Sequence, residues 1–355
     1  MTGIGISGTG RIGRLLIRSL IEKAELTEQL KAINSTYPAE TIAHLLKYDS
    51  VHGTWKADVS AEDGKLRIND RLIPCVSHRN PEEIPWKELG VQLVMDATGK
   101  FNDREGAMRH IAAGASRVII TAPGKEMDMT IVMGVNDHQF HPARHHILSA
   151  ASCTTNCVAP VLKILDDNFQ VKSGWMTTVH AVTSDQNLLD NPHKDLRRAR
   201  ACTQSIIPTS TGVRKALADV LPHLAPYVEG LSLRVPTQDV SLVDLTVQVG
   251  RSASAADVKE AFKWAAAHTF AGYVAYSEEP LVSVDYVGNS HSAIIDGLSI
   301  MQQGQQVKVL AWYDNEWAYA CRVVELAGTV ARQENQSEPS NHRIPALVIA
   351  DEISY

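Results

Sequence analysis

The first half of the chain alternates short apolar runs with segments whose apolar residues recur at helical spacing. Residues 11–22, for example, place Leu16 and Leu20 on one side of a helix. Strands that alternate with helices in this way predict a parallel sheet covered on both faces. The predicted strands are 3–7, 30–34, 91–96 and 118–121, and the predicted helices are 11–22, one that starts near Pro38, and 104–113.

The pattern changes after Ser152, where longer strands follow a single helix. The last of these strands alternates apolar and polar residues, as a strand does when only one of its faces is buried. We therefore predict one large sheet with helices packed against one face, and a domain boundary near residue 150. The predicted helix is 154–169, and the strands are 174–180, 231–235 and 240–249.

The end of the chain contains a closing helix and a tail of different composition. The helix is predicted at 318–332, and residues 333–342 are polar and expected to be flexible. Residues 344–350 are mostly apolar and have the composition to dock on the body of the protein or on a partner. The predicted division is a first domain 1–152, a second domain 153–317, a helix 318–333 that returns to the first domain, and a tail 334–355 of unassigned role.

A glycine-rich turn, Gly8-Thr9-Gly10-Arg11-Ile12-Gly13, joins the first strand to the first helix. Its first glycine permits the tight turn, its second lets a pyrophosphate approach the backbone, and its third lets helix and strand pack closely. The helix N-terminus adds free N–H groups for phosphate. The motif predicts dinucleotide binding. The expected fold is thus α/β, with an N-terminal Rossmann-type parallel sheet and an α+β domain that has a large, mostly antiparallel sheet.

The end of the second strand bears on the choice of dinucleotide. NAD sites usually have Asp or Glu there, about 20 residues after the glycines, to hold the ribose 2′-OH. This chain has Asn34-Ser35-Thr36 and no carboxylate. Ser35 can donate to a 2′-phosphate without repelling it, which favours NADP. The alternative interpretation is that position 35 does not contact the cofactor.

Composition narrows the class of protein. The 355 residues are 44% apolar and 21% charged, as in soluble globular enzymes. A net charge of -6 gives no general attraction to nucleic acid or to an anionic membrane, and no apolar run approaches the length of a membrane helix. Five cysteines, an odd number, favour reduced thiols in a cytoplasmic enzyme over a disulfide framework.

Cys153 stands where a predicted strand gives way to a helix, in Ser152-Cys153-Thr154-Thr155-Asn156-Cys157. A helix N-terminus stabilises a thiolate, so Cys153 is a candidate nucleophile. The alternative is that both cysteines are small buried apolar residues, which suits Cys157 better than Cys153. His180, at the end of the strand 174–180, is a candidate base.

Several segments resemble the glyceraldehyde-3-phosphate dehydrogenase family, in the family's order and over residues 3 to about 330. Residues 34–40 are similar to the NADP-preferring bacterial paralogue. The segments are Ala151-Ser152-Cys153-Thr154-Thr155-Asn156-Cys157, His193-Lys194-Asp195-Leu196-Arg197-Arg198-Ala199-Arg200, Thr209-Ser210-Thr211-Gly212, Leu233-Arg234-Val235-Pro236 and Trp312-Tyr313-Asp314-Asn315-Glu316-Trp317.

The resemblance implies a mechanism of phosphorylating oxidation without a metal. Cys153 attacks the aldehyde of glyceraldehyde 3-phosphate, and His180 removes a proton while hydride passes to the nicotinamide. The resulting thioester is displaced by inorganic phosphate as 1,3-bisphosphoglycerate. The implied substrate-phosphate residues are Thr183 and Arg234, those for the attacking phosphate are Ser152, Thr154, Thr211 and Gly212, and Arg198 lies between the two sites.

The resemblance also implies a glycolytic or gluconeogenic homotetramer whose basic run 197–200 lies near a neighbouring subunit's cofactor rather than on RNA. Ser35 departs from the family's usual Asp, and Asn191 replaces an apolar residue, which again suits a 2′-phosphate. The implied cofactor residues are Gly10, Arg11, Ile12, Ser35, Arg79, Thr121 and Asn315.

Two other functions compete with this one. Erythrose-4-phosphate dehydrogenase shares the motif around Cys153 but makes an acid, so it has less need of a phosphate pocket, and the presence of Thr211 and Gly212 favours the phosphorylating enzyme. A binding protein on the same fold is disfavoured because Cys153, His180 and Arg234 are all present.

Overall fold

In the computed structural model, which describes residues 1–337, the first half of the chain forms a nine-stranded sheet in the order β3-β4-β5-β2-β1-β6-β7-β9-β8. β1 lies between β2 and β6, parallel to both, while β3 and β4 pair antiparallel at the edge. The strands are β1 Ile4–Ser7, β2 Leu30–Asn34, β3 Val59–Glu62, β4 Lys65–Ile68, β5 Arg71–Val76, β6 Leu93–Asp96, β7 Arg117–Ile120, β8 Met129–Thr130 and β9 Ile147–Ser149.

The parallel strands of this sheet bring several loops to one edge. β2, β1, β6, β7 and β9 run in the same direction, so their carboxyl ends meet there. Gly8 follows β1, Ser35 follows β2, and Ala150 follows β9. Ligands of open α/β sheets bind outside these carboxyl ends. The topology therefore brings the glycine turn and the approach to Cys153 to the same edge.

The helices of the first half pack close to the sheet. Gly13 shows how close, because a Cβ at this position would lie 2.0 Å from the carbonyl oxygen of Gly8. Only glycine lets the helix approach the turn so closely. Leu16 and Leu20 are fully buried, as the helical pattern predicts. The helices are α1 Arg11–Glu22, α2 Ala24–Thr27, α3 Ala39–Lys47 and α4 Arg104–Ala112, with 3₁₀ turns at Pro81–Glu83 and Asp137–Gln139.

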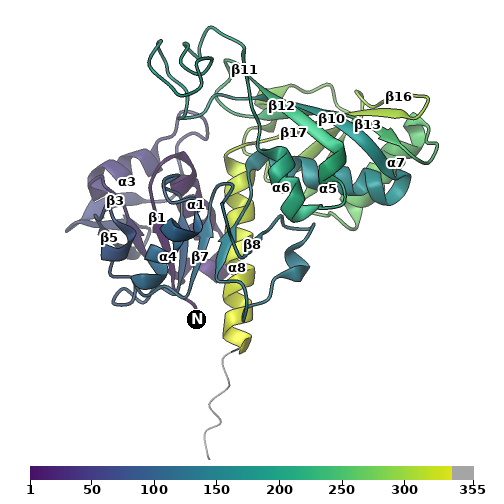
Figure 1. The fold of residues 1–355 in the computed structure, drawn as a ribbon. Helices are drawn as coiled ribbons and strands as arrows, with labels where there is room; N and C mark the ends of the chain where they lie inside the picture. Colours follow the sequence, from purple (N-terminus) through teal and green to yellow (C-terminus); the bar gives the residue numbers. More distant parts are fainter. Residues whose placement is uncertain (338–355) are drawn as a thin grey trace, which may run out of the picture.

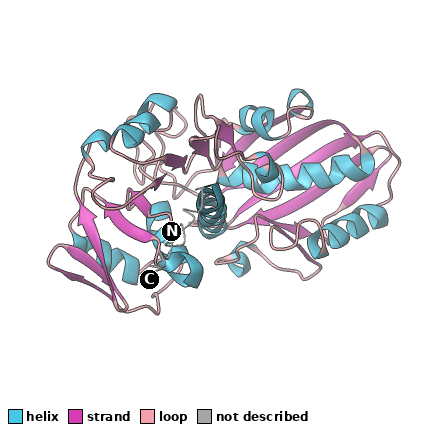
Figure 2. Ribbon diagram, turned by 90° about the horizontal axis from the view of Figure 1, so that it is seen from below, coloured by secondary structure: helices cyan, strands magenta, loops and turns pink. Residues whose placement is uncertain are grey.

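The second half forms an eight-stranded sheet, in the order β11-β12-β10-β13-β17-β15-β14 with β16 beside β17. It is mostly antiparallel, although β10 and β12 are parallel, as are β14 and β15. Figure 2 shows the helices of this half in front of the large sheet. Both sheets have the character that the sequence predicts, and the fold class is confirmed.

The elements of the second half alternate strands with three helices and two 3₁₀ turns. The strands are β10 Val171–His180, β11 Ile207–Thr209, β12 Val228–Arg234, β13 Ser241–Val249, β14 Val274–Ser277, β15 Ala293–Asp296, β16 Met301–Gln303 and β17 Gln306–Tyr313. The helices are α5 Cys153–Phe169, α6 Val213–Val220 and α7 Ala255–Ala267, with 3₁₀ turns at Ala225–Tyr227 and Ser283–Tyr286.

The last helix, α8 (Trp317–Ser337), stands between the two halves of the molecule (Figure 1). It packs along α1, and its Val323 and Ala327 belong to the apolar core of the first sheet. The expectation of a flexible segment from residue 333 is wrong for residues 333–337, which continue the helix. Glu334 is half-buried there and forms an ion pair with Arg117. Residues 338–342 and the apolar segment 344–350 lie outside the described residues.

Within residues 1–337, none of the helices combines the length and the apolar character that crossing a bilayer requires.

Candidate active site

The backbone makes a sharp elbow just before Cys153. Ala151, between β9 and α5, has a φ of 56°, in the left-handed region that a residue with a Cβ seldom adopts. Its carbonyl oxygen accepts a hydrogen bond of 2.9 Å from the Tyr319 hydroxyl on α8. Ser152 then caps the helix, because its Oγ accepts from the N–H of Thr155 at 3.1 Å. The elbow and the cap place Cys153 at the first position of α5.

The imidazole of His180, at the end of β10, lies beside this thiol. Its Nε2 is 3.5 Å from Sγ of Cys153. Its Nδ1 faces an acceptor, the carbonyl oxygen of Ala181 at 2.7 Å, and a donor, Nη1 of Arg234 at 3.2 Å. With the proton on Nδ1 and donated to the closer Ala181 carbonyl, Nε2 offers its lone pair to the thiol. This is the geometry of a nucleophile with its general base.

Burial shifts the pKa values of both Cys153 and His180. It lowers the pKa of His180 to about 3, with a further contribution from the nearby guanidinium of Arg234. Burial also raises the pKa of the Cys153 thiol, although Arg234 and the N–H of Thr154 oppose the shift. The N–H of Thr154 thus favours the thiolate, as expected of a helix N-terminus, while burial opposes it. Burial shifts both groups towards their neutral forms.

Arg234 ends β12, and the parallel register of β10 and β12 sets it directly beside His180. Its Nη1 donates to the carbonyl oxygen of Ala181 at 3.1 Å and to Oγ1 of Thr183 at 3.2 Å. Its buried Nε has no hydrogen-bond partner among the described residues. A guanidinium with an unused donor beside a threonine hydroxyl fits a bound phosphate. The structure thus brings Arg234, Thr183 and the Cys153–His180 pair together.

Arg198 comes from the long loop between β10 and β11, which projects from the top of the molecule in Figure 1. Its Nε donates to Oγ1 of Thr209 at 2.9 Å, and it forms an ion pair with Asp185. Its charge depresses the pKa values of both His180 and Arg234, so it lies within electrostatic range of them. Gly212 is the N-cap of α6, no side chain caps this helix, and a Cβ at Gly212 would meet no atom within 4 Å, so the backbone there is open.

The remaining expected phosphate residues differ in how their side chains lie. Thr211, next to Gly212, is half-buried. The hydroxyl of Thr154 is buried and lies 2.9 Å from the Tyr313 hydroxyl, so its backbone N–H is the group left at the mouth of α5. Tyr313 also contacts the hydroxyl of Thr178 at 2.8 Å. No local sequence pattern indicates these roles of Tyr313 and Tyr319, because their contacts join residues far apart in the chain.

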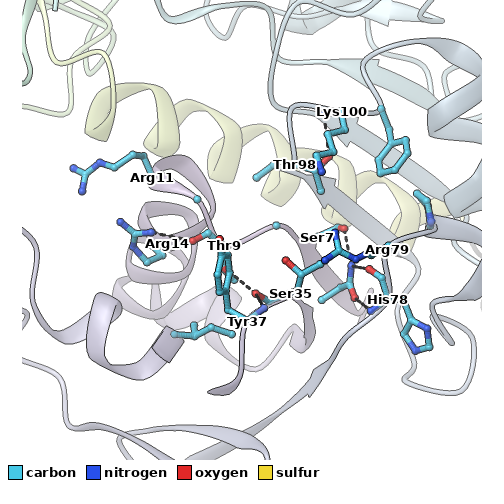
Figure 3. A pocket seen from close by; sticks show the side chains of 18 of the residues that line it. Ser7, Thr9, Arg11, Arg14, Ser35, Tyr37, His78, Arg79, Thr98 and Lys100 are labelled. Carbon is cyan, nitrogen blue, oxygen red and sulfur yellow. Dashed lines mark hydrogen bonds between the residues drawn. The ribbon is translucent and has the colours of Figure 1, made fainter. Parts of the chain in front are cut away.

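A cavity of about 520 Å³ lies at the carboxyl edge of the first sheet, where the glycine turn faces the end of β2 (Figure 3). Gly8 has a φ of 97°, and a Cβ there would meet the backbone of Ala97 at 2.8 Å, so glycine is required. Gly10 faces open space, and no side chain caps α1. This bare backbone at a helix N-terminus fits a pyrophosphate. Gly10, Arg11, Ser35 and Arg79 line the cavity together with Ser184 from the loop after β10.

Ser35 is buried at the base of this cavity. Its Oγ lies 2.6 Å from the Thr9 hydroxyl and accepts from the N–H of Tyr37 at 3.2 Å. Because Ser35 already accepts from Tyr37, its own proton or that of Thr9 can be turned towards an anion. Figure 3 shows this pair on the same side of the cavity as His78 and Arg79.

The other expected cofactor residues lie in different surroundings. The side chain of Arg11 points away from the glycine turn in Figure 3 and forms ion pairs with Asp49 and Glu316, so only its backbone is available to a pyrophosphate. Asn315 is buried, and its Oδ1 accepts from the Ser241 hydroxyl at 2.6 Å. Ile12, Thr121 and Asn315 are not among the residues that line the cavity.

A dinucleotide cavity at the carboxyl edge of the first sheet, and a cysteine that follows this edge beside a histidine from the second sheet, fit an oxidoreductase that works through a covalent cysteine intermediate. Two family models then match the chain: glyceraldehyde 3-phosphate dehydrogenase, NAD binding domain, over residues 2–104, and the C-terminal domain of the same enzyme over residues 152–315. The chain belongs to the glyceraldehyde-3-phosphate dehydrogenase family.

Curated relatives agree over most of the chain. Glyceraldehyde-3-phosphate dehydrogenase 2 of Bacillus subtilis is 55% identical over 331 residues, which cover 92% of this chain and 96% of the relative. Glyceraldehyde-3-phosphate dehydrogenase of Geobacillus stearothermophilus is 50% identical over 329 residues, which cover 92% of this chain and 98% of the relative. Glyceraldehyde-3-phosphate dehydrogenase 2 of Staphylococcus epidermidis is also 50% identical, over 333 residues that cover 93% of this chain and 96% of the relative.

Proposed function

We propose that the chain oxidises D-glyceraldehyde 3-phosphate to 1,3-bisphosphoglycerate, reversibly, with NADP or NAD as hydride acceptor, in glycolysis or gluconeogenesis. The observation that carries this proposal is the contact between Cys153 Sγ and His180 Nε2, at the sheet edge that also forms the dinucleotide cavity. The names of the curated relatives support the substrate.

The first half of the reaction uses the neutral pair directly. Sγ of Cys153 adds to the aldehyde carbon as its proton passes to Nε2 of His180, and His180 delivers that proton to the former aldehyde oxygen, which gives a thiohemiacetal. Arg234 and Thr183 hold the substrate phosphate, and Arg198 is shared with the second anion site. His180 then takes the proton of the thiohemiacetal hydroxyl as the hydride leaves the carbon, which becomes a thioester. A buried imidazole with a low pKa releases each proton readily.

The nicotinamide cofactor, when bound, accepts the hydride that leaves this carbon. The chain would hold it with the backbone of Gly10, Arg11 and Ile12, the hydroxyl of Ser35, and Arg79, with Thr121 and Asn315 towards its other parts. Inorganic phosphate then breaks the C–S bond of the thioester, and the thiol of Cys153 is restored. Backbone N–H groups at Gly212 and Thr154 and the hydroxyls of Ser152 and Thr211 would hold the attacking phosphate.

We infer a preference for NADP from the surroundings of Ser35. The Ser35–Thr9 hydroxyl pair offers a donor where a carboxylate would repel a 2′-phosphate, and Arg79 adds a positive charge to the cavity lining. NAD remains a substrate, because nothing in this pair rejects a 2′-hydroxyl.

We also infer a homotetramer built partly on the sheet face that the helices leave open. Trp175 is 73% exposed on β10, and Leu231 is 46% exposed on the neighbouring β12. Large apolar side chains on one open face are typical of a protein interface. Trp175→Glu should lower the mass measured by light scattering, whereas Trp264→Glu, on the outer helix α7, should not. A wild-type monomer in solution would refute this assembly.

The domain division into 1–152, 153–317, 318–333 and 334–355 stands as our proposal for limited proteolysis to test. We propose a cytoplasmic location, because all five cysteines are free thiols, as expected in a reducing compartment.

The names of the relatives do not favour the alternative substrate, erythrose 4-phosphate. The deciding experiment follows NADPH formation from glyceraldehyde 3-phosphate with and without inorganic phosphate or arsenate. We expect turnover to require one of the two anions. Equal rates without them would mean that water, rather than phosphate, releases the acyl group.

A further inference from the structure

A group of buried charges lies under the loop that carries Asn315, between β17 and α8. We call it the acid cluster. On one side, Asp314 and Glu316 flank Asn315 in the chain. On the other, Asp239 precedes Ser241, whose hydroxyl contacts Asn315. The acid cluster consists of the carboxylates Asp49, Asp239, Asp314 and Glu316, the guanidinium groups of Arg11 and Arg14, and the imidazole of His52.

The charges of the acid cluster do not balance. Four carboxyl groups face two guanidinium groups, so the acid cluster holds fewer cations than carboxyl groups. Arg11 forms ion pairs with Asp49 and Glu316, so its charge is already used. Uncompensated charge of this kind is costly in a buried site, because burial removes the solvent that would screen it.

Asp239 carries most of this deficit. Its side chain is only 1% exposed, and neither carboxylate oxygen has a hydrogen-bond partner among the described residues. By contrast, Asp314 accepts from the backbone N–H groups of Gly288, Glu316 and Trp317. Nε2 of His52 lies 3.6 Å from Oδ2 of Asp239, beyond hydrogen-bond distance. The buried oxygens of Asp239 are therefore open to a further ligand among these side chains.

We propose that the acid cluster binds a divalent transition-metal ion, Zn²⁺ or Mn²⁺, through Nε2 of His52 and one oxygen each of Asp239 and Asp314. These donor atoms lie within 4.8 Å of one another. Donors bound at roughly 2.0–2.2 Å are at most about 4.4 Å apart, so shifts of a few tenths of an ångström close the site. One imidazole with two carboxylates suits these ions better than Ca²⁺ or Mg²⁺, which prefer oxygen ligands alone.

The site has an approach from solvent and a neighbour in the proposed reaction. A cavity of about 690 Å³ is lined by His52, Gly288 and Trp317, next to the donor atoms. A divalent ion would supply the positive charge that the acid cluster lacks. It would also tie the Asp239 segment to Asp314, next to Asn315. The backbone between Asp239 and Ser241 is already strained, since Val240 has a φ of 63°.

The experiment measures Mn²⁺ binding by electron paramagnetic resonance, in which bound Mn²⁺ loses its sharp free-ion signal. It uses the full chain after chelator treatment and removal of bound dinucleotide, because a pyrophosphate would itself bind Mn²⁺. Mn²⁺ prefers oxygen ligands to thiolates, so Cys153 does not compete. The expected result is one Mn²⁺ per chain, displaced by Zn²⁺.

Two variants test the ligands. Asp239→Asn and His52→Gln should each weaken Mn²⁺ binding at least about tenfold, since even loss of an outer-shell partner costs that much. Glu62→Gln, which removes an exposed carboxylate paired with Arg67, should bind like wild type. Melting curves establish that each variant is folded.

No bound Mn²⁺ at millimolar concentration, or unchanged affinity in folded Asp239→Asn, would overturn the proposal. Neither of these outcomes bears on the proposed dehydrogenase reaction, because the site uses neither Cys153 nor His180.

Discussion

Nε2 of His180 lies 3.5 Å from Sγ of Cys153, although the two residues come from the end of a strand and the start of a helix 27 positions apart. The sheet register fixes the histidine, and the elbow at Ala151 fixes the cysteine. Neither side chain needs the substrate to reach its partner. The site is therefore set before substrate binds, and its chemistry can be tested residue by residue.

Cys153→Ser should lower turnover by at least about 10³-fold, because it removes the nucleophile of the reaction. Cys157→Ser should keep most of the activity, since the Cys157 thiol is buried and its pKa is raised by that burial. Steady-state kinetics and iodoacetamide labelling measure both effects. Labelling of wild type should accelerate towards alkaline pH, because the pKa of Cys153 is raised. Equal losses in the two variants would mean that the nucleophile is misassigned.

His180 should make the protein less stable in mild acid. Its pKa is about 6.5 when unfolded and about 3 when folded. Above about pH 6.5 neither state holds the proton, so the effect is absent. As the pH falls from 6.5 towards 3, the unfolded chain takes up a proton that the folded chain refuses, and stability is lost by up to about 1.4 kcal/mol per pH unit.

Urea unfolding at several pH values measures this slope. His180→Asn should flatten it, and His268→Asn, at an exposed position, should leave it unchanged. The same His180→Asn variant should slow single-turnover hydride transfer by about 10²-fold or more, because the general base is gone. A slope that is identical in wild type and His180→Asn would contradict the low pKa.

Arg234→Gln should weaken substrate binding and also change its neighbour. Loss of the guanidinium removes a bidentate hydrogen-bond donor to the substrate phosphate, so KM for glyceraldehyde 3-phosphate should rise by about tenfold or more. It also removes a positive charge that depresses the pKa of His180, so that pKa should rise towards its usual range. NMR titration of the histidines measures the second effect. Arg214→Gln, at an exposed position on α6, should change neither quantity. A pKa that stays low without Arg234 would leave burial and Arg198 as its causes.

Ser35→Asp should shift cofactor use from NADP towards NAD. A carboxylate near a 2′-phosphate repels it by about 4 kcal/mol at 4 Å and an effective dielectric near 20, and solvent reduces this. We expect the ratio of kcat/KM for NADP to that for NAD to fall at least about tenfold, mainly through weaker NADP binding. Ser35→Ala removes the hydroxyl without adding charge and should have the smaller effect. A wild type that strongly favours NAD would refute the role of Ser35.

The sequence predicts the parts of this site that depend on local order. The glycine turn lies between β1 and α1, and Cys153 at the start of α5, because each follows from a strand, a turn and a helix adjacent in the chain. The side chain of Arg11 points away from the glycine turn because it pairs with Asp49 and Glu316, which lie far from it in sequence. The Thr154–Tyr313 contact and the surroundings of the unpaired Asp239 carboxylate also depend on residues that are distant in sequence. Long-range partners of this kind leave no periodic signal.

The hydrogen bond from Tyr319 to Ala151 joins the last described helix to the backbone just before the nucleophile. α8 also packs along α1, which begins at the glycine turn. A movement that opens the space between the two sheets must therefore either carry the cysteine along with the dinucleotide side or break this bond. The C-terminal helix thus fixes the backbone before Cys153 relative to the first domain. Tyr319→Phe should therefore loosen the position of Cys153 relative to the nicotinamide site, although it changes neither of them directly.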